Sequence, residues 1–203
     1  MILYHNPASP FVRKVRMLLA ETGQTASVDL KSAVGTPTDS GTLPLAENPL
    51  GKIPCLVRND GPALYDSRVI CRYLDTQHTG APLYPGAPRL WDTLVLEATA
   101  DGIMDAAVLM IYEGRTRPED RRHAPWVEAQ WAKVTRGLDA LEGRWMAHLR
   151  GPLDMGQLAV AAALGYLDFR HADRDWRSGR PALAAWEEEF RARPSVQSTI
   201  PEG

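Results

Sequence analysis

The spacing of apolar positions along the chain changes in kind at about residue 79. Before that point short apolar runs alternate with helical spacing, and after it only helical spacing recurs. The short runs predict strands at 2–4, 26–30, 53–57 and 63–65, the last two joined as a hairpin by the turn at 59–62. Helical spacing predicts helices at 9–22 and 67–78. This order predicts a small α/β domain with a mixed sheet over residues 1–78.

The predicted helix at 9–22 has one apolar face. Its members recur at helical spacing: Val12, Val15, Leu18 and Leu19. Arg13, Lys14 and Arg16 fall outside this face, which predicts that all three cations point to solvent. Between residues 32 and 47 Gly, Pro, Thr and Ser dominate, and we expect a loop with a poorly formed helix there.

Residues 79–88 form a Pro/Gly-rich connector, where we expect the domain boundary. Four helices are predicted after it, at 90–113, 126–149, 154–169 and 182–193. Pro194 is expected to stop the last of them. The third is rich in Ala and apolar enough to be central. The chain therefore predicts an all-helical second domain over residues 89–203.

Composition excludes several classes of protein. The 203 residues are 44% apolar and 24% charged, which is ordinary for a globular protein with a real core. A net charge of −2 gives no electrostatic case for nucleic acid or an anionic membrane surface. No apolar run is long enough for a transmembrane helix, and the strand-like start without a basic leader argues against a signal peptide. Cys55 and Cys71 form no C-x-x-C motif, so we expect two core thiols and a reducing compartment, most simply the cytoplasm.

Ser9 stands between the first predicted strand and Pro10, which suits a first helical turn. One interpretation is an N-cap, in which the hydroxyl accepts hydrogen bonds from free amides. The other uses the same geometry for function. A helix N-terminus offers free N–H groups and a partial positive charge, and a hydroxyl there can donate to a bound thiolate. The sequence leaves both interpretations open.

Two further segments have the chemistry to hold a small zwitterionic peptide. The Ile53-Pro54 bond follows a turn and is a candidate for the cis form, which would turn the Ile53 backbone outward to pair with an extended peptide. Lys52 would face a terminal carboxylate, although a solvated lysine is the alternative. Asp66 and Ser67 open a predicted helix, where they can act as ordinary caps or can hold an ammonium and a carboxylate.

Other motifs point to structure rather than chemistry. Asp154 and Gln157 form a D-x-x-Q pattern that predicts a capping box at the central helix. The five histidines lack metal-ligand spacing, so no metal site is predicted. The Arg/His run at 115–123 is interpreted as a solvated loop between helices. No Gly-rich phosphate loop and no G-x-S-x-G motif occur.

In this order the motifs resemble a glutathione S-transferase over nearly the whole chain. The features shared with the family are the strand–Ser9-Pro10–helix start, the segment NPLGKIP at 48–54, Asp66-Ser67 with its helix, the connector and the all-helical half. The resemblance implies a thioredoxin-like N-terminal domain with a cis-proline, a helical C-terminal domain and a cytosolic homodimer. It also implies glutathione as co-substrate, with no permanently bound cofactor and a role in detoxification.

Carried over residue by residue, the resemblance gives a candidate site. Ser9 would activate the thiol, as in the serine-using bacterial branches. The Ile53 backbone beside Pro54 would pair with the cysteinyl part of glutathione, and Lys52 would lie near the glycine carboxylate. The remaining assignments concern the γ-glutamyl end and the second substrate. Asp66 and Ser67 would hold that end, Asp105 or less favourably Asp101 would reach the partner subunit's γ-glutamyl amine, and Pro7, Phe11, Ile111 and Tyr112 would line an apolar electrophile pocket.

The chain also departs from relatives of known chemistry. No cysteine stands at Ala8-Ser9-Pro10, which argues against dithiol chemistry through a protein thiol. The Ser-rich signature of the maleylacetoacetate-isomerase branch is absent as well. The leading hypothesis is transfer of glutathione to an electrophilic small molecule. Two alternatives stay open: glutathione-dependent reduction of a disulfide or peroxide, and a non-catalytic binding or dimerisation module of the same fold.

Overall fold

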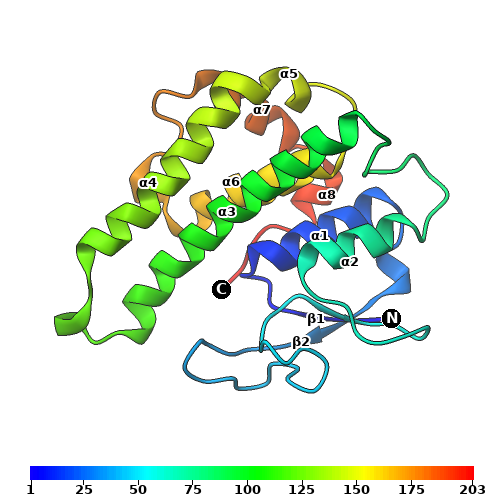
Figure 1. Ribbon diagram of the computed structural model, residues 1–203, viewed down its shortest axis with the longest axis horizontal. Helices are drawn as coiled ribbons and strands as arrows, with labels where there is room; N and C mark the ends of the chain where they lie inside the picture. Colours follow the sequence, from blue (N-terminus) through cyan, green and yellow to red (C-terminus); the bar gives the residue numbers. More distant parts are fainter.

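The computed structural model describes all 203 residues and divides into a small sheet region and a larger helical region (Figure 1). The sheet holds three strands in the order β2-β1-β3. β1 (Ile2–His5) runs parallel to β2 (Asp29–Ser32) and antiparallel to β3 (Cys55–Val57). The register pairs Ile2 with Asp29 on one side and with Val57 on the other. The mixed sheet expected from the sequence is confirmed.

Two helices cover one face of this sheet, α1 (Pro10–Glu21) and α2 (Ser67–Asp75), and they separate it from the helical region (Figure 1). Leu3 points to this face and joins the large core, whereas Tyr4 points to the other face and packs with Ala33 and Cys55. The alternation follows from the two-residue period of a strand. Both Cys55 and Cys71 are buried free thiols, as expected.

Three predicted strands differ from the observed ones. The strand predicted at 53–57 begins only at Cys55. The strand predicted at 26–30 begins at Asp29 instead of Ala26, because Thr25–Ser27 form a short 3-10 turn (η1). All four β2 residues are exposed, so pairing with β1 fixes its position rather than burial. The predicted strand at 63–65 shrinks to a single bridge between Leu56 and Leu64. Pro62 has no amide to extend the ladder, and its carbonyl accepts a hydrogen bond from the Arg58 side chain (2.9 Å).

The helical region contains six α-helices: α3 (Arg89–Thr116), α4 (Ala124–Ala140), α5 (Met146–Leu149), α6 (Met155–Arg170), α7 (Pro181–Phe190) and α8 (Pro194–Gln197). Short turns of other helical types lie between them: η2 (Glu119–Arg121), η3 (Leu141–Trp145) and η4 (Ala172–Arg174). α6 is central, and every residue from Met155 to Leu164 is buried. Its capping box is confirmed, since Asp154 and Gln157 each bind the other's backbone amide. No helix is long and apolar enough to cross a membrane.

Four helix predictions need correction. α3 continues to Thr116, so Arg115 belongs to a helix and not to the solvated loop. The helix predicted at 126–149 is interrupted by the π-helical turn η3. Pro194 does not stop α7, which ends at Phe190; it starts α8, where a proline without an amide suits the first turn. No helix forms between residues 33 and 54, where turns and one Thr36–Asp39 bridge replace the poorly formed helix.

The prediction that Arg13 and Lys14 point to solvent is wrong. Arg13 is 5% exposed and Lys14 is fully buried, because α1 is covered by the helical region on the flank that the sequence pattern assigned to solvent. The Arg13 guanidinium lies against Gly165 of α6, and no side chain larger than hydrogen fits there without displacing it. Its Nη2 donates to the Val196 carbonyl (3.4 Å). The large core is accordingly continuous between the two regions.

Candidate functional site

Ser9 caps α1, where its Oγ accepts a hydrogen bond from the Val12 amide (3.3 Å). The half-buried hydroxyl keeps its own hydrogen free to donate. Pro10 has no amide, and the Phe11 amide has no partner within the protein. The structural role of Ser9 therefore leaves one hydroxyl and one amide available at the helix N-terminus, which is the arrangement an anion requires.

The segment before β3 presents a free piece of backbone. Asn48 is buried and ties the turn together, with Nδ2 donating to the Lys52 carbonyl (2.8 Å) and Oδ1 accepting from the Leu50 amide (3.1 Å). Gly51 follows with φ +59°, which glycine adopts readily. The Ile53-Pro54 bond is cis. The N–H and C=O of half-buried Ile53 bind nothing in the protein, so they are open to an extended ligand. Lys52 is exposed and forms no ion pair.

Asp66 is the N-cap of α2, and its Oδ1 accepts from the Arg68 amide (2.9 Å). The Arg68 guanidinium also donates to Asp66 Oδ2, at 2.9 and 3.3 Å. Burial opposes ionisation of Asp66, but these bonds outweigh it and lower its pKa. Ser67 is 3% exposed, and neither its hydroxyl nor its amide has a partner. The helix start thus combines an ionised carboxylate with free donors. Arg68 was not anticipated from the sequence, although it stands two residues after the cap.

A buried network of charged side chains connects to the start of α2 through Arg68. Lys14 Nζ contacts Glu97 Oε1 (3.0 Å) and Asp101 Oδ1 (2.7 Å), and the Tyr84 hydroxyl donates to Glu97 (3.0 Å). Asp101 in turn lies 3.5 Å from Arg68 Nε. Burial opposes the charge on Lys14, but Glu97 and Asp101 outweigh it and raise its pKa. α1, α2 and α3 are therefore tied together by alternating charges.

The structure distinguishes the two aspartates that the resemblance offered for the γ-glutamyl amine. Asp101 is 5% exposed and bound to Lys14, whereas Asp105, one turn further along α3, is exposed. Burial and Asp101 raise the pKa of Asp105, while Lys52 and Arg68 act in the opposite direction. Groups predicted from separate segments thus lie within electrostatic reach of one another, and Asp105 is the accessible candidate.

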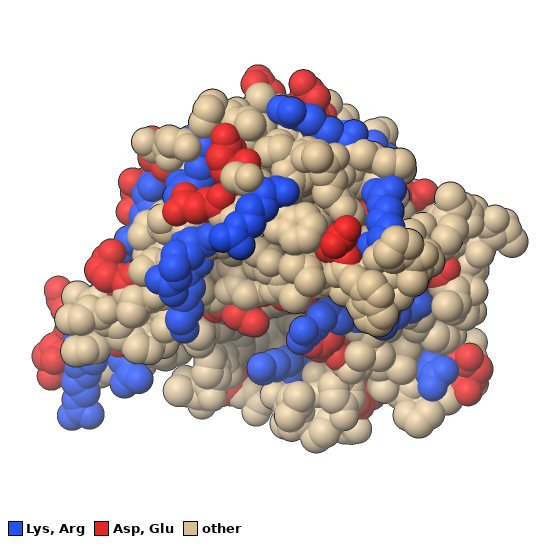
Figure 2. All heavy atoms as spheres, turned by 45° about the horizontal axis from the view of Figure 1, so that its top comes forward, with Lys and Arg blue, Asp and Glu red and all other residues tan.

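The four residues predicted to line the electrophile pocket come from two helices. Pro7 and Phe11 flank the start of α1, and Ile111 and Tyr112 lie in the last turns of α3; all four are half-buried. α1 packs against α6 and α3, and this packing supplies the framework for a cleft. The last residue, Gly203, lies beside Ala8. Figure 2 shows a hollow between the helical region and the sheet region, with acidic and basic side chains interspersed around it.

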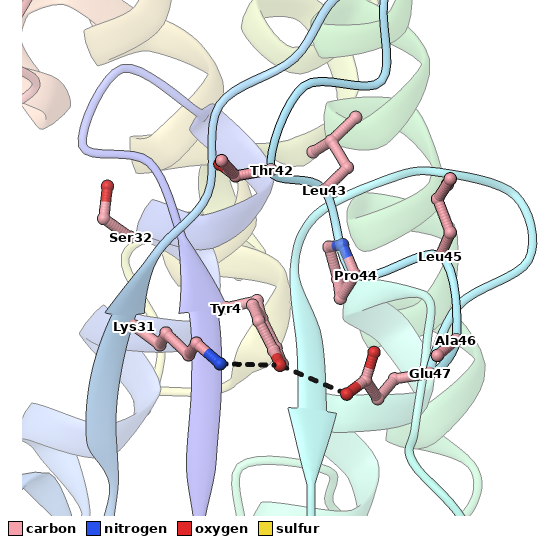
Figure 3. Close-up of a pocket in the computed structure, with 9 residues that line it drawn as sticks. All are labelled: Tyr4, Lys31, Ser32, Thr42, Leu43, Pro44, Leu45, Ala46 and Glu47. Carbon is pink, nitrogen blue, oxygen red and sulfur yellow. Dashed lines mark hydrogen bonds between the residues drawn. The ribbon is translucent and has the colours of Figure 1, made fainter.

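A pocket of about 720 Å³ lies elsewhere, between β1, β2 and the segment 42–47 (Figure 3). Lys31 Nζ donates to the Tyr4 hydroxyl (3.2 Å), which donates to Glu47 Oε1 (3.1 Å). Because its polar groups already satisfy each other, this pocket offers little to a ligand, and none of its lining residues is a predicted site residue. No group of three or more His, Cys, Asp or Glu side chains is placed to hold a metal ion.

Comparison with known proteins identifies the class. The sequence matches the models for the glutathione S-transferase N-terminal domain over residues 3–82 and C-terminal domain over residues 124–189. With its thioredoxin-like β/α domain followed by a helical domain, the chain belongs to the glutathione S-transferase family. The uncharacterized GST-like protein YibF of Escherichia coli K12 is 33% identical over 204 residues, covering 99% of this chain and 98% of its own. Glutathione S-transferase 3 of Zea mays is 30% identical, covering 98% and 92%.

A solved structure is more similar still. A glutathione transferase family member from Pseudomonas fluorescens Pf-5, with bound glutathione, is 47% identical and superposes with a TM-score of 0.97, covering 100% of this chain and 99% of that one. The family member from the same organism with bound S-(propanoic acid)-glutathione gives a TM-score of 0.93 at the same identity, covering 100% of both chains. The ligands belong to those structures.

Proposed function

We propose that this protein is a glutathione transferase, which binds glutathione at the N-termini of α1 and α2 and activates its thiolate for attack on an electrophilic small molecule. One observation carries the proposal most: Ile53, Ser67 and Ser9 each present a hydrogen-bonding group that has no partner within the protein. The glutathione bound to the 47% identical relative supports it.

In this proposal glutathione lies extended along the Ile53 backbone, which pairs with its cysteinyl part. Lys52 faces the glycine carboxylate. Ser67, with its hydroxyl and free amide, receives the γ-glutamyl carboxylate, and Asp66 receives the ammonium beside Arg68. The side chains that close on the two charged ends of the peptide therefore come from different segments, which favours a ligand of one length.

Ser9 activates the thiol by stabilising its charged form. Lowering the thiol pKa by about two units from ~8.5 requires roughly 2.7 kcal/mol of preferential thiolate stabilisation. A hydrogen bond to a charge contributes about 1.5–3 kcal/mol, and a helix N-terminus adds about 0.3–1 kcal/mol. The Ser9 hydroxyl and the free Phe11 amide suffice without a general base, and the thiol proton leaves to solvent.

The test is titration of glutathione bound to the protein, followed by the ultraviolet absorbance of the thiolate. We expect the wild type and the control Ser40→Ala, an exposed loop serine, to lower the thiol pKa by about two units. Ser9→Ala should lose most of that shift and keep its glutathione affinity. An unshifted thiol in the wild type would contradict the mechanism, and a full shift in Ser9→Ala would remove Ser9 from it. Failure to bind glutathione at all would favour the non-catalytic module.

We further propose that the protein is a homodimer. Trp91 and Val95 of α3 are 63% and 49% exposed, and Val69 of α2 is 46% exposed. Trp91, Val95 and Asp105 lie on the same side of α3 at helical spacing. A partner subunit that covers Trp91 and Val95 would therefore bring its glutathione site close to Asp105. Light scattering should give twice the chain mass for the wild type and the monomer mass for Val95→Glu; a monomeric wild type would contradict the proposal.

A further inference from the structure

One buried cation of α1 has no counter-charge in contact with it. Arg13 is 5% exposed and forms no ion pair, whereas its neighbour Lys14 contacts Glu97 and Asp101. The side chain makes one long hydrogen bond, from Nη2 to the Val196 carbonyl (3.4 Å), and its Nε and Nη1 have no partner within the protein. Buried side-chain donors are nearly always hydrogen-bonded, so the unused nitrogens of Arg13 indicate a role for its charge.

The fold makes room for this guanidinium between three helices. α1 packs against α6 and α8, which lie above it in Figure 1. Gly165 stands within α6, where glycine is unfavourable compared with alanine, and a side chain there would collide with Arg13 Nη1. α8 supplies the Val196 carbonyl. The charge of Arg13 is therefore held in one place and cannot swing out into solvent.

The guanidinium of Arg13 stays charged at neutral pH. Burial lowers the pKa of Arg13 to about 10, the carboxylates of Glu187 and Asp168 act in the opposite direction, and Arg16 lowers it slightly further. Both carboxylates form their ion pairs with Arg177, at 2.7 Å for Glu187 and 2.5 Å for Asp168. They therefore favour the charged form of Arg13 from a distance and do not neutralise it by contact.

Helix geometry brings this charge close to Ser9. The two residues are four apart, and the Arg13 amide donates to the Ser9 carbonyl (3.0 Å), which closes the first turn of α1. Residues at this spacing lie on the same side of a helix, with Cβ atoms about 5–6 Å apart, and long side chains point back toward the helix N-terminus. The Arg13 side chain therefore extends toward the end of α1 where the Ser9 hydroxyl and the Phe11 amide are free.

We propose that the buried charge of Arg13 stabilises the glutathione thiolate in front of Ser9 without touching it. This inference rests on the proposed function of the same site. At about 8–10 Å and an effective dielectric constant of about 40, one positive charge lowers the pKa of a thiol by roughly half a unit to one unit. Ser9 supplies the larger part of the shift, and Arg13 adds to it. The thiol proton still leaves to solvent.

The test is titration of the thiol of bound glutathione in variants that separate charge from packing. Arg13→Met keeps an unbranched side chain without the charge and should raise the thiol pKa by about half a unit to one unit. Arg13→Lys keeps the charge and should retain most of the wild-type shift. The control Arg16→Met removes a half-buried cation one turn further along α1 and should change the thiol pKa by less than about 0.2 unit. Glutathione affinity should stay unchanged in all three variants, because Arg13 is no part of the peptide clamp.

A purely structural role of Arg13 predicts different results. It would lower the melting temperatures of Arg13→Met and Arg13→Lys and leave the thiol pKa of both at the wild-type value, which would overturn the inference. An equal rise of the thiol pKa in both variants would overturn it too, because the effect would not follow the charge. Arg13→Gln, neutral and polar, replaces Arg13→Met if that variant does not fold. A wild type that binds glutathione without lowering its thiol pKa would instead contradict the proposed function itself.

Discussion

The peptide side and the electrophile side of the proposed site are formed by different kinds of groups. The peptide side uses backbone groups and helix caps, with the Ile53 backbone free just before β3 and Ser67 and Ser9 at helix starts. The electrophile side uses side chains from distant helices, among them Phe11 of α1 and Tyr112 of α3. Backbone and cap geometry follow from local sequence, whereas side-chain walls depend on how the helices pack. This difference explains why the peptide side could be predicted from sequence motifs, whereas the walls of the electrophile side could not.

The largest expected effect concerns the buried ion pairs of Lys14, which connect α1 to α3. Lys14→Met leaves Glu97 and Asp101 buried without their cation, and we expect the free energy of unfolding to fall by about 3–5 kcal/mol. Urea denaturation measures the change, and Arg136→Met, an exposed cation on α4, serves as the control. A loss below about 1 kcal/mol, the range of a surface ion pair, would mean that the network is solvated and does not tie the helices.

The same network has a defined pH dependence. Because the fold raises the pKa of Lys14, its stabilisation is complete below the unfolded value of ~10.4 and is lost as the pH rises through the folded value. The gap in unfolding free energy between the wild type and Lys14→Met should therefore stay constant from about pH 7 to about pH 9 and narrow only in more alkaline solution. A gap that already narrows within that window would contradict the assignment.

A smaller effect isolates the peptide side. Asp66→Asn removes the charge proposed to hold the ammonium, and glutathione affinity should fall by about 1.5–3 kcal/mol in a calorimetric titration. Asp29→Asn changes an exposed carboxylate on β2 that has no side-chain partner and should leave the affinity unchanged. Since Asp66 also caps α2, the melting temperature of the variant should be measured in parallel. Unchanged affinity in a folded Asp66→Asn protein would remove this residue from the site.

The smallest effect isolates the apolar wall. Ile111→Ala removes a half-buried part of the predicted pocket, and KM for an apolar electrophile should rise about fivefold, or about 1 kcal/mol. The KM for glutathione should not change, because Ile111 is none of the residues proposed to hold glutathione. Leu109→Ala, an exposed position on the same helix, is the matched control. Equal changes in both KM values would show that the two sides are not separable.

Much of the fold could be predicted because its signals are local. β1, α1, α2 and the central helix α6 appear where apolar periodicity and capping residues indicated them. The strand predicted at 63–65 does not form. A strand needs a neighbouring strand to pair with along its length, which local sequence does not reveal, and here only Leu64 pairs, with Leu56. β2 shifted for the same reason, since the β1 edge and not hydrophobicity sets its register.

The buried cations Arg13 and Lys14 show what apolar periodicity cannot predict. Arg13 and Lys14 interrupt the apolar spacing of α1 and so indicate solvent, yet both are covered by the helical region. Their partners, Glu97, Asp101 and the groove beside Gly165, lie more than 80 residues further along the chain. A charged side chain can be buried in a core only when the fold places an opposite charge or a hydrogen-bond partner next to it.

By itself the sequence determined the family, the order of elements and the caps at Ser9, Asp66 and Asp154, and it predicted the residues of a peptide clamp. These depend on interactions within a few residues, which a linear pattern records. The tertiary structure decided that Asp101 is occupied and Asp105 accessible, that Arg68 joins Asp66, and that Lys14 lies buried between Glu97 and Asp101. Each of these depends on which helix faces which, and helix packing brings together charges that the chain keeps far apart.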